Sequence, residues 1–400
     1  MTIDRQKLVD ALKSCARFVG SATSAPYLRN ALFTGTHYSC TISATDGRKF
    51  YERYIPCVGD NGTFAISPQR LLQLLNSCTD ELVHIIVDDN AVIVYSGGAQ
   101  VQLSKMSVDD FPPFPRVTDP VSFEITASNL RNAISKIIFA ASILPYKTNI
   151  NGMNVELRDG MLCCTCTDGH RLSFTTAEVT EVLTPGNESI QALIPLESVV
   201  ELRRILDGLD CAVMVNINDQ SAEILIGIKI QNNDGVIADE RVVTSLALDR
   251  FPSTQTQSIL EKDNPNKVRI DTGALISTIK RAMSVIDYIA PAVVLKADAN
   301  TLNISVRSTY GKYVEDIECQ YDGEPVEVML NPNYLLDALG VSASKVVIGI
   351  LDDTSPVTIQ DDEEEPTSKH VIMPLGDTHE GRVRGVASLR PAGLGSARLG

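Results

Sequence analysis

The sequence is short of basic side chains. Its 400 residues contain 35 Lys and Arg against 50 Asp and Glu, which gives a formal net charge of −15. Because an acidic surface repels phosphates, this composition taken alone argues against a nucleic-acid partner. The chain also lacks any apolar run of the ~18 to 20 residues that a membrane span requires. Its amphipathic start lacks the uninterrupted apolar stretch of a signal peptide, so we expect a cytoplasmic protein.

The cysteine spacing of a disulfide framework and the common catalytic motifs are absent as well. The nine cysteines are an odd number spread over the whole chain, which favours reduced thiols over a disulfide scaffold. The sequence contains no GxxxxGK[ST], HExxH or GxSxG, the usual signatures of nucleotide-binding loops, zincins and hydrolases. The remaining composition, 44% hydrophobic and 21% charged, is that of an ordinary folded protein of two or three domains.

A threefold internal repeat is the main positive feature. An apolar stripe at helical spacing occurs three times, and each copy follows a residue whose side chain can cap a first helical turn: Asp4, Thr126 and Asp271. The aligned stripes are Leu8, Ala11, Leu12, Cys15 and Val19; Leu130, Ala133, Ile134, Ile137 and Ala141; and Leu275, Thr278, Ile279, Ala282 and Ile286. Three aligned caps and stripes predict one amphipathic helix per repeat.

A second helix repeats in the same order. Residues 66–72, 194–200 and 330–336 each follow a short apolar strand and begin with cap or proline residues. Between the two helices of a unit lie period-2 stretches, such as 39–43 and 161–166, which predict strands. The predicted unit is therefore helix, strands, helix, strands, in an α+β fold.

Proline-containing segments mark the boundaries of the units. Residues 108–112 and 248–252 both end in Phe-Pro and close a unit. The predicted units are residues 1–118, 119–262 and 263–375. Residues 376–400 hold six glycines and no apolar periodicity, so we expect a flexible tail there. A remnant of cloning, a frame extension and a regulatory segment that competes for a binding pocket are three open origins of this tail.

Several motifs, in this order and spacing, resemble the family of bacterial DNA polymerase III beta subunits, the sliding clamps. They are FPPFP at 111–115, TDGHRL at 167–172, NPNYLLDAL at 331–339, TSPV at 354–357 and VIMPL at 371–375. The resemblance covers residues 1–375 and implies three clamp domains per chain, with two chains head to tail in a closed ring, helices inside and sheets outside.

The resemblance also implies a function. A protein of this family has no enzymatic activity and needs no cofactor. It encircles duplex DNA without reading its sequence, and it tethers the DNA polymerase III alpha subunit and other proteins that carry a clamp-binding motif. A closed homodimer further implies a clamp-loader ATPase as a partner.

The distribution of charge agrees with helices that face DNA. The six repeated helices (4–19, 67–77, 127–142, 196–206, 272–285 and 332–341) carry a net +6, which leaves −21 for the rest of a chain of net −15. The residues expected to face DNA are Lys13, Arg17, Arg70, Arg131, Lys136, Lys280 and Arg281, and the resemblance adds Lys147 in a loop. Contacts of this kind go to phosphates and permit sliding. The alternative is that these charges are simply solvated.

The resemblance further implies a pocket for partner peptides between the second and third domains. Its expected residues are Ile150, Gly169, His170, Arg171, Leu172, Pro252, Thr354, Pro356, Val371, Ile372, Met373, Pro374 and Leu375. An apolar groove with a methionine suits short peptides with Leu or Phe anchors. The alternative is that 371–375 is merely an edge strand of the core. The segment 253–257, Ser-Thr-Gln-Thr-Gln, departs from the acidic, aromatic, basic and apolar residues that the family usually has there.

The sequence leaves alternative hypotheses about function. A specialised paralogue or a phage clamp with altered partners is compatible with the changed segment 253–257. A metal-dependent hydrolase using Asp168 and His170 is the rival from another class, but such pairs are common in turns without catalysis. Cys163, Cys166 and His170 could suggest zinc, yet alternation along a strand directs the two cysteines to opposite faces. We therefore expect no catalytic residue and no metal.

Overall fold

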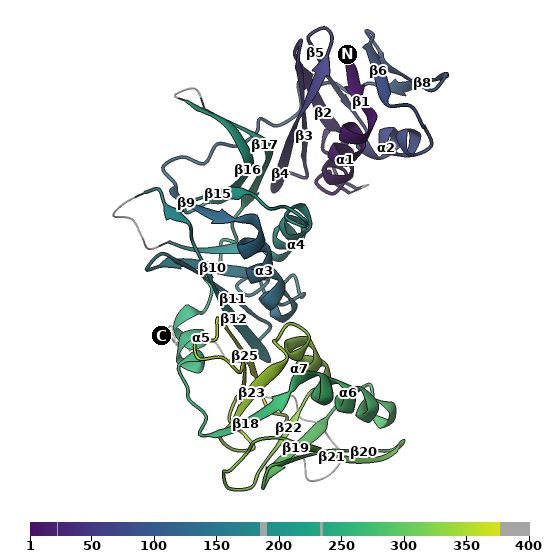
Figure 1. The fold of residues 1–400 in the computed structure, drawn as a ribbon. Helices are drawn as coiled ribbons and strands as arrows, with labels where there is room; N and C mark the ends of the chain where they lie inside the picture. Colours follow the sequence, from purple (N-terminus) through teal and green to yellow (C-terminus); the bar gives the residue numbers. More distant parts are fainter. Residues whose placement is uncertain (22, 185–189, 233–234, 377–400) are drawn as a thin grey trace, which may run out of the picture. The chain divides into compact units, whose positions relative to one another are not determined.

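The computed structural model describes residues 1–21, 23–184, 190–232 and 235–376, so the predicted tail lies almost wholly outside the described residues. The described residues form α-helices and antiparallel sheets, as expected for an α+β fold (Figure 1). The chain divides into two compact units. Unit 1 consists of Met1–Asn132, Val155–Leu162 and Ala177–Leu248, and unit 2 of Ala133–Asn154, Cys163–Thr176 and the residues from Asp249 onward.

All six predicted helices are present. The first helices of the repeats are α1 (Arg5–Cys15), α3 (Ala127–Ile137) and α6 (Thr272–Ala282), and the second helices are α2 (Pro68–Asn76), α4 (Leu196–Ile205) and α7 (Pro332–Leu339). Short 3-10 turns are η1 (Pro26–Arg29), η2 (Ile138–Ala140), which continues α3, and η3 (Met283–Val285), which continues α6. A further helix, α5 (Ser253–Leu260), was not predicted, because its Ser, Thr and Gln residues form no apolar stripe.

The predicted caps and stripes of the first helices are confirmed. Side-chain oxygens of Asp4, Thr126 and Asp271 accept hydrogen bonds from backbone N–H groups three residues later, at 2.9, 3.1 and 2.7 Å. The stripe residues from Leu8 to Cys15, Leu130 to Ala141 and Leu275 to Ile286 are buried. Val19 differs: it lies beyond the end of α1 and is half-buried, while Phe18 fills the core instead.

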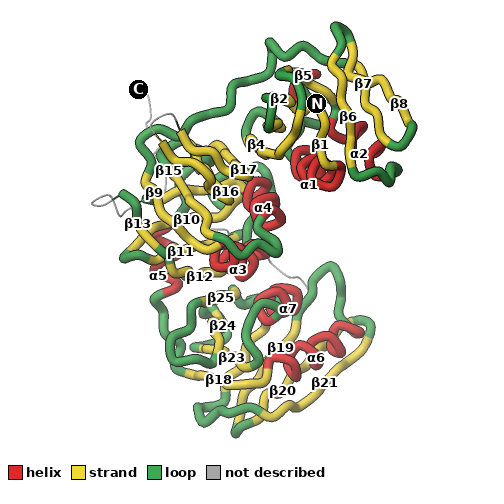
Figure 2. The backbone as a smooth tube through the Cα atoms, turned by 45° about the horizontal axis from the view of Figure 1, so that its top comes forward, coloured by secondary structure: helices red, strands yellow, loops and turns green. Residues whose placement is uncertain are grey.

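Unit 1 contains one large antiparallel sheet. Its order is β13-β9-β15-β16-β17-β4-β1-β6-β7-β8, with β3 also paired to β4 and β2 paired to both β3 and β5. The strands are β1 (Thr2–Asp4), β2 (Ala31–Gly35), β3 (Ser39–Thr45), β4 (Lys49–Val58), β5 (Gly62–Ile66), β6 (Leu82–Val87), β7 (Ala91–Ser96), β8 (Ala99–Ser104), β9 (Val121–Thr126), β13 (Glu181–Val182), β15 (Ala212–Ile217), β16 (Ser221–Asn232) and β17 (Gly235–Ser245). Figure 2 shows β6, β7 and β8 side by side, with β8 outermost.

The pairing of β4 with β17 joins the first repeat to the second through buried charges. Glu240 lies opposite Arg53 in the ladder and forms an ion pair with it, and the Tyr51 hydroxyl donates to the same carboxylate at 2.6 Å. Beside it, Arg241 lies 4.5 Å from the Phe114 ring and donates to the carbonyl oxygen of Pro115 at 2.9 Å. The proline-rich segment between the repeats is thus fastened to the sheet.

Unit 2 contains the third repeat and the middle of the second. Two further antiparallel sheets have the orders β14-β10-β11-β12-β25-β24-β23-β18 and β21-β20-β19-β22. The strands are β10 (Gly152–Arg158), β11 (Met161–Thr167), β12 (Arg171–Glu178), β14 (Gln191–Pro195), β18 (Asn266–Asp271), β19 (Val293–Asp298), β20 (Thr301–Ser308), β21 (Gly311–Glu318), β22 (Val326–Leu330), β23 (Lys345–Ile350), β24 (Val357–Asp361) and β25 (Ser368–Ile372). Helices α6 and α7 pack beside each other over one shared core (Figure 1).

The cap of α6 provides a test of this description. We expect Asp271→Ala to lower the free energy of unfolding by about 1 kcal/mol, because the N–H of Ala274 loses its acceptor. Asp271→Ser should retain most of the stability, since a serine hydroxyl also caps. Urea unfolding followed by circular dichroism measures both. Asp322→Ala, at an exposed position outside the helices, is the control, and an equal loss there would contradict the capping role.

Candidate peptide groove and basic helix faces

The TDGHRL motif forms a tight turn between β11 and β12. Asp168 Oδ1 accepts hydrogen bonds from the N–H groups of His170 and Arg171, at 2.8 and 3.0 Å, and the Gly169 N–H donates to Thr167 Oγ1 at 3.1 Å. Gly169 has φ of +95°, in the left-handed region that favours glycine. The sequence of the turn is therefore explained by its backbone geometry.

The first repeat contains the same turn. Asp46 Oδ1 accepts from the N–H groups of Arg48 and Lys49, Gly47 N–H donates to Thr45 Oγ1, and Gly47 has φ of +96°. This turn has the aspartate and the glycine but no histidine. The repeated role of the aspartate is therefore to fix the turn, and Asp168 needs no catalytic function to account for its contacts.

Strand pairing brings the turn next to the C-terminal segment 371–375. Arg171 lies opposite Ile372 and Leu172 opposite Val371 in the β12–β25 ladder. Beyond the ladder, the Met373 N–H donates to the carbonyl oxygen of His170 at 2.9 Å. Two parts of the predicted pocket, more than 190 residues apart in the sequence, are thus neighbours in unit 2.

The exposure of the predicted pocket residues is uneven. Leu172, Val371 and Ile372 are only 4%, 2% and 1% exposed, so they belong to the core. Exposed or half-buried residues among the predicted set are Gly169, His170, Arg171, Pro252, Thr354, Pro356, Met373 and Leu375, whereas Ile150 and Pro374 are buried. Only eight of the thirteen predicted pocket residues are therefore accessible at the surface.

The remaining predicted walls lie in the same unit. Pro356 immediately precedes β24, whose Val357 lies opposite Ile372. Its carbonyl oxygen accepts from Asn264 Nδ2 at 2.8 Å. Ile150 ends a loop whose Lys147 reaches the turn, because Lys147 Nζ donates to the carbonyl oxygen of Asp168 at 3.0 Å. Pro252 occupies the N-cap position of α5, so the changed segment 253–257 is helical.

Arg171 has partners that sequence reasoning missed. Its guanidinium carbon lies 4.4 Å from the centre of the Tyr334 ring and 5.3 Å from that of Phe139, and its NH1 lies 2.5 Å from Asp337 Oδ2. Burial raises the pKa of the Tyr334 hydroxyl, as does the nearby Asp168 carboxylate, and Arg171 opposes the rise. The signal was present in NPNYLLDAL, which places Tyr334 and Asp337 one helical turn apart.

Most of the basic residues predicted to face DNA have acidic partners. The pairs are Lys13–Asp10 (3.2 Å), Arg17–Glu201 (2.7 Å), Arg131–Asp207 (2.7 Å), Lys136–Asp361 (3.9 Å) and Arg281–Glu315 (2.6 Å). Lys147 donates to a carbonyl oxygen instead. Among the described residues, Lys280 and Arg70 have no acidic partner within 4.0 Å. Any phosphate would therefore compete with carboxylates at five of these eight side chains.

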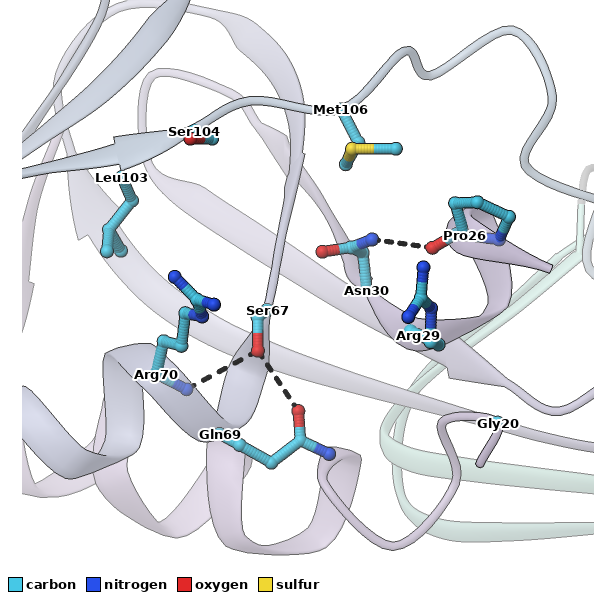
Figure 3. Close-up of a pocket in the computed structure, with 10 residues that line it drawn as sticks. All are labelled: Gly20, Pro26, Arg29, Asn30, Ser67, Gln69, Arg70, Leu103, Ser104 and Met106. Carbon is cyan, nitrogen blue, oxygen red and sulfur yellow. Dashed lines mark hydrogen bonds between the residues drawn. The ribbon is translucent and has the colours of Figure 1, made fainter. Parts of the chain in front are cut away.

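Arg70 lines a cavity of about 480 Å³ in the first repeat (Figure 3). Its backbone N–H is capped by Ser67, and Arg29 lines the same cavity. Leu103 and Ser104, on the outermost strand β8, form another part of the wall. Two arginines thus lie beside the free edge of the sheet in unit 1.

His370 is a buried titratable group on β25, opposite Ser173 of β12. It is 1% exposed on β25, its Nδ1 lies 3.0 Å from Ser173 Oγ, and its ring lies 5.6 Å from Phe139. Its Nε2 has no hydrogen-bond partner among the described residues. Burial lowers the pKa of His370 to about 4; Asp361 opposes this shift and Lys136 adds to it.

Metal-binding clusters and membrane-spanning helices are both absent from the described residues. Within residues 1–21, 23–184, 190–232 and 235–376, no group of three or more His, Cys, Asp or Glu side chains is arranged to hold a metal ion. Cys166 is fully buried and Cys163 half-buried on the same strand. No helix in this part of the chain is both long enough and apolar enough to cross a membrane.

Comparison with known proteins finds one family over nearly the whole chain. Family models of the N-terminal, central and C-terminal domains of the DNA polymerase III beta subunit match residues 1–115, 124–251 and 257–376. The beta sliding clamp of Haemophilus influenzae is 26% identical over 379 residues, covering 94% of this chain and 99% of the relative. That of Bacillus subtilis is 25% identical over 390 residues, covering 94% and 98%.

Solved structures have the same fold. A Pseudomonas aeruginosa DNA polymerase sliding clamp with a ligand matches with a TM-score of 0.86 at 22% identity, and a Bacillus subtilis clamp with 0.85 at 24%. A P. aeruginosa clamp bound to griselimycin also gives 0.86 at 22% identity. Each comparison covers 94% of this chain and 99% of the other. The likeness extends over all three repeats.

The depressed pKa of His370 predicts a loss of stability in acid. A histidine that stays neutral in the folded protein but has its ordinary pKa of 6.5 when unfolded makes the unfolded state bind the additional proton. We therefore expect His370 to cost about 1 kcal/mol of stability per pH unit as the pH falls from 6.5 to about 4.

Melting temperatures measured across this pH range should fall less steeply for His370→Gln than for the unsubstituted chain. His170→Gln, at an exposed position in the same unit, is the control and should keep the full slope. NMR titration of the His370 ring gives the midpoint directly. A midpoint near 6.5 would contradict the assigned environment.

Proposed function

The chain belongs to the family of DNA polymerase III beta subunits, and from this membership we propose that it is a sliding clamp, the processivity factor that encircles duplex DNA and tethers the replicative polymerase. The observation that carries the proposal is the match of all three domain models, in order, over residues 1–376 of a threefold repeat. We assign one clamp domain each to residues 1–118, 119–262 and 263–375, and place the protein in the cytoplasm.

Two free sheet edges support a ring of two chains joined head to tail. Strand β8 ends the large sheet of unit 1, and strand β21 ends the four-stranded sheet of unit 2. An unpaired edge offers backbone groups to a strand of another chain. Strand β21 carries Glu315, Asp316 and Glu318, while Arg29 and Arg70 lie beside β8. Opposite charges favour pairing of β8 in one chain with β21 in the other.

The basic helix faces support loose, sequence-independent contact with DNA. The ion pairs of Lys13, Arg131 and Arg281 are between exposed or half-exposed side chains, and such pairs contribute only ~0–1 kcal/mol each. A phosphate can therefore replace the carboxylate at little cost. Lys280 is exposed and has no acidic partner among the described residues, so a phosphate need not displace a carboxylate there. These contacts position DNA without reading its sequence, and ring closure supplies the retention.

The groove formed by the 168–172 turn and residues 371–375 is the proposed binding site for the DNA polymerase III alpha subunit and other proteins with a clamp-binding motif. The P. aeruginosa clamp bound to griselimycin supports a ligand site on this fold. We propose no catalytic residue: both oxygens of Asp168 are engaged by the turn and by Arg171. A clamp-loader ATPase is the proposed partner for ring opening.

One observation favours a clamp with altered partners as the second candidate. The wall that follows Pro252 is the helix α5, with exposed Thr254, Gln255 and Gln257. Its C-terminal end is held by Lys369, whose Nζ donates to the carbonyl oxygens of Leu260 and Lys262 at 2.7 and 3.1 Å. A fixed polar wall would select a different peptide residue from the basic and apolar wall usual in the family.

The clamp function is tested by retention on circular DNA. After treatment with a clamp loader and ATP, we expect the protein to remain on nicked circular DNA through gel filtration and to leave when the circle is linearised, because a topological link has no end to slide from on a circle. The control omits ATP. Equal loss from circular and linear DNA, or a protein that stays monomeric at micromolar concentration in light scattering, would overturn the proposal.

The ring joint is tested by reversing the charge of Arg70. We expect Arg70→Glu to weaken the dimer at least ~10-fold in sedimentation equilibrium, because it places a like charge against β21 of the other chain. Lys280→Glu, which also reverses an exposed basic residue without an acidic partner, should leave the dimer intact and weaken retention on DNA instead. An unchanged dimer for Arg70→Glu, with weaker retention on DNA, would return Arg70 to the helix face that meets DNA.

A further inference from the structure

We propose that Arg171 is a positioning residue: a socket formed by Phe139, Tyr334 and Asp337 holds its guanidinium, so that Arg171 shapes the peptide groove from behind instead of offering its charge to the peptide. We call these three residues the Arg171 socket. The inference rests on the proposed peptide-binding function and assigns a role to three residues that are not among those predicted to line the groove.

The contacts of Arg171 use two of its donors and its planar face. Nε donates to Asp168 Oδ2 at 3.0 Å, and NH1 donates to Asp337 Oδ2 at 2.5 Å. The guanidinium also lies 4.4 and 5.3 Å from the ring centres of Tyr334 and Phe139. Only 13% of the side chain is exposed. A guanidinium stacked on aromatic rings and bonded to two carboxylates is a well-satisfied arrangement that a lysine cannot reproduce.

This arrangement disfavours an ion pair between the Arg171 guanidinium and an acidic group of the peptide. An acidic peptide group that took over Nε would have to displace Asp168, and a mostly buried carboxylate left without its partner is costly. Asp168 is 18% exposed and also holds the backbone of the turn, so its displacement would loosen that turn. The Nε donor of the arginine is therefore committed to the turn.

The backbone of Arg171 transmits the effect of the socket to the groove. Arg171 is the first residue of β12 and lies opposite Ile372, and its own N–H donates to Asp168 Oδ1. The preceding residue, His170, accepts the Met373 N–H at 2.9 Å. Fixing the side chain of Arg171 thus fixes the spacing between exposed His170 and half-buried Met373, on the two sides of the groove.

The socket itself is built on regular elements. Tyr334 and Asp337 are three residues apart on α7 and so lie on the same side of that helix. Phe139 belongs to η2 and also packs against the His370 ring of β25, at 5.6 Å. All of these residues belong to unit 2. Supports on helices and strands hold a site more firmly than supports on loops.

The first test removes the charge of the socket. We expect Asp337→Asn in the full-length chain to weaken binding of a fluorescent peptide with glutamine, leucine and phenylalanine residues three- to tenfold, measured by anisotropy. Hydrogen exchange of the Met373 amide should become faster, while the His370 amide within β25 keeps its rate. Asp322→Asn, an exposed neutralisation elsewhere in unit 2, is the matched control and should change neither.

A double-mutant cycle separates positioning from direct contact. If Arg171 acts through the turn, Arg171→Ala combined with Asp337→Asn should bind the peptide no more weakly than Arg171→Ala alone. Arg171→Lys should not restore affinity, since an ammonium group cannot stack and bridge two carboxylates together. Additive losses, or tighter binding by Asp337→Asn because the guanidinium is released toward the peptide, would overturn the inference.

The outcomes also distinguish this inference from the proposed function. The unsubstituted chain could be retained on circular DNA and bind the peptide, while Asp337→Asn equals it in peptide affinity and in the exchange rate of the Met373 amide. This result would overturn the role of the Arg171 socket and leave the proposed clamp function intact. An unsubstituted chain that neither binds the peptide nor stays on circular DNA would remove the function on which the inference rests. Asp337 is 46% exposed, so its substitution leaves the core intact.

Discussion

Antiparallel strand pairing across the repeat boundaries is the constraint on which the other features depend. Each repeat would leave a row of unpaired backbone groups if its sheet ended at its own last strand, and the ladders β4–β17 and β12–β25 remove that cost. The second ladder also sets the register that places Arg171 opposite Ile372. The turn and the C-terminal segment therefore meet because β12 and β25 pair, and the proposed groove depends on this pairing.

Ion pairs neutralise part of the acidic charge of the chain. Glu240 is buried at the first ladder against Arg53 and Tyr51, and other carboxylates pair with the basic residues of the repeated helices. The net charge of −15 is thus not spread evenly over a repelling surface. Where the paired side chains are exposed, the ion pairs contribute little to stability, so the proposed exchange of a carboxylate for a DNA phosphate costs little.

How far the sequence predicts the structure depends on the range of the interaction. The caps at Asp4, Thr126 and Asp271 and the turn at Asp168 depend on residues within three positions, so local patterns were enough to find them. The pairing of Arg17 with Glu201 and the packing of Phe139 and Tyr334 around Arg171 depend on tertiary contacts. The local pattern NPNYLLDAL shows that Tyr334 and Asp337 share one side of a helix, but it does not show which residue they contact. Helix α5 was missed because its faces do not differ in polarity.

Residues 371–375 consist of a buried part, as a core strand requires, and a half-accessible part, which the proposed pocket wall needs. Val371 and Ile372 lie within β25 and are buried, as a core strand requires. At Met373 the chain leaves the strand, and its N–H donates to His170; two residues later the Leu375 N–H donates to the carbonyl oxygen of Met329 on β22. Met373 and Leu375 stay half-buried, held by their backbones with part of each side chain accessible. A peptide with Leu or Phe anchors would therefore meet these two side chains over a floor whose position is set by the buried pair before them.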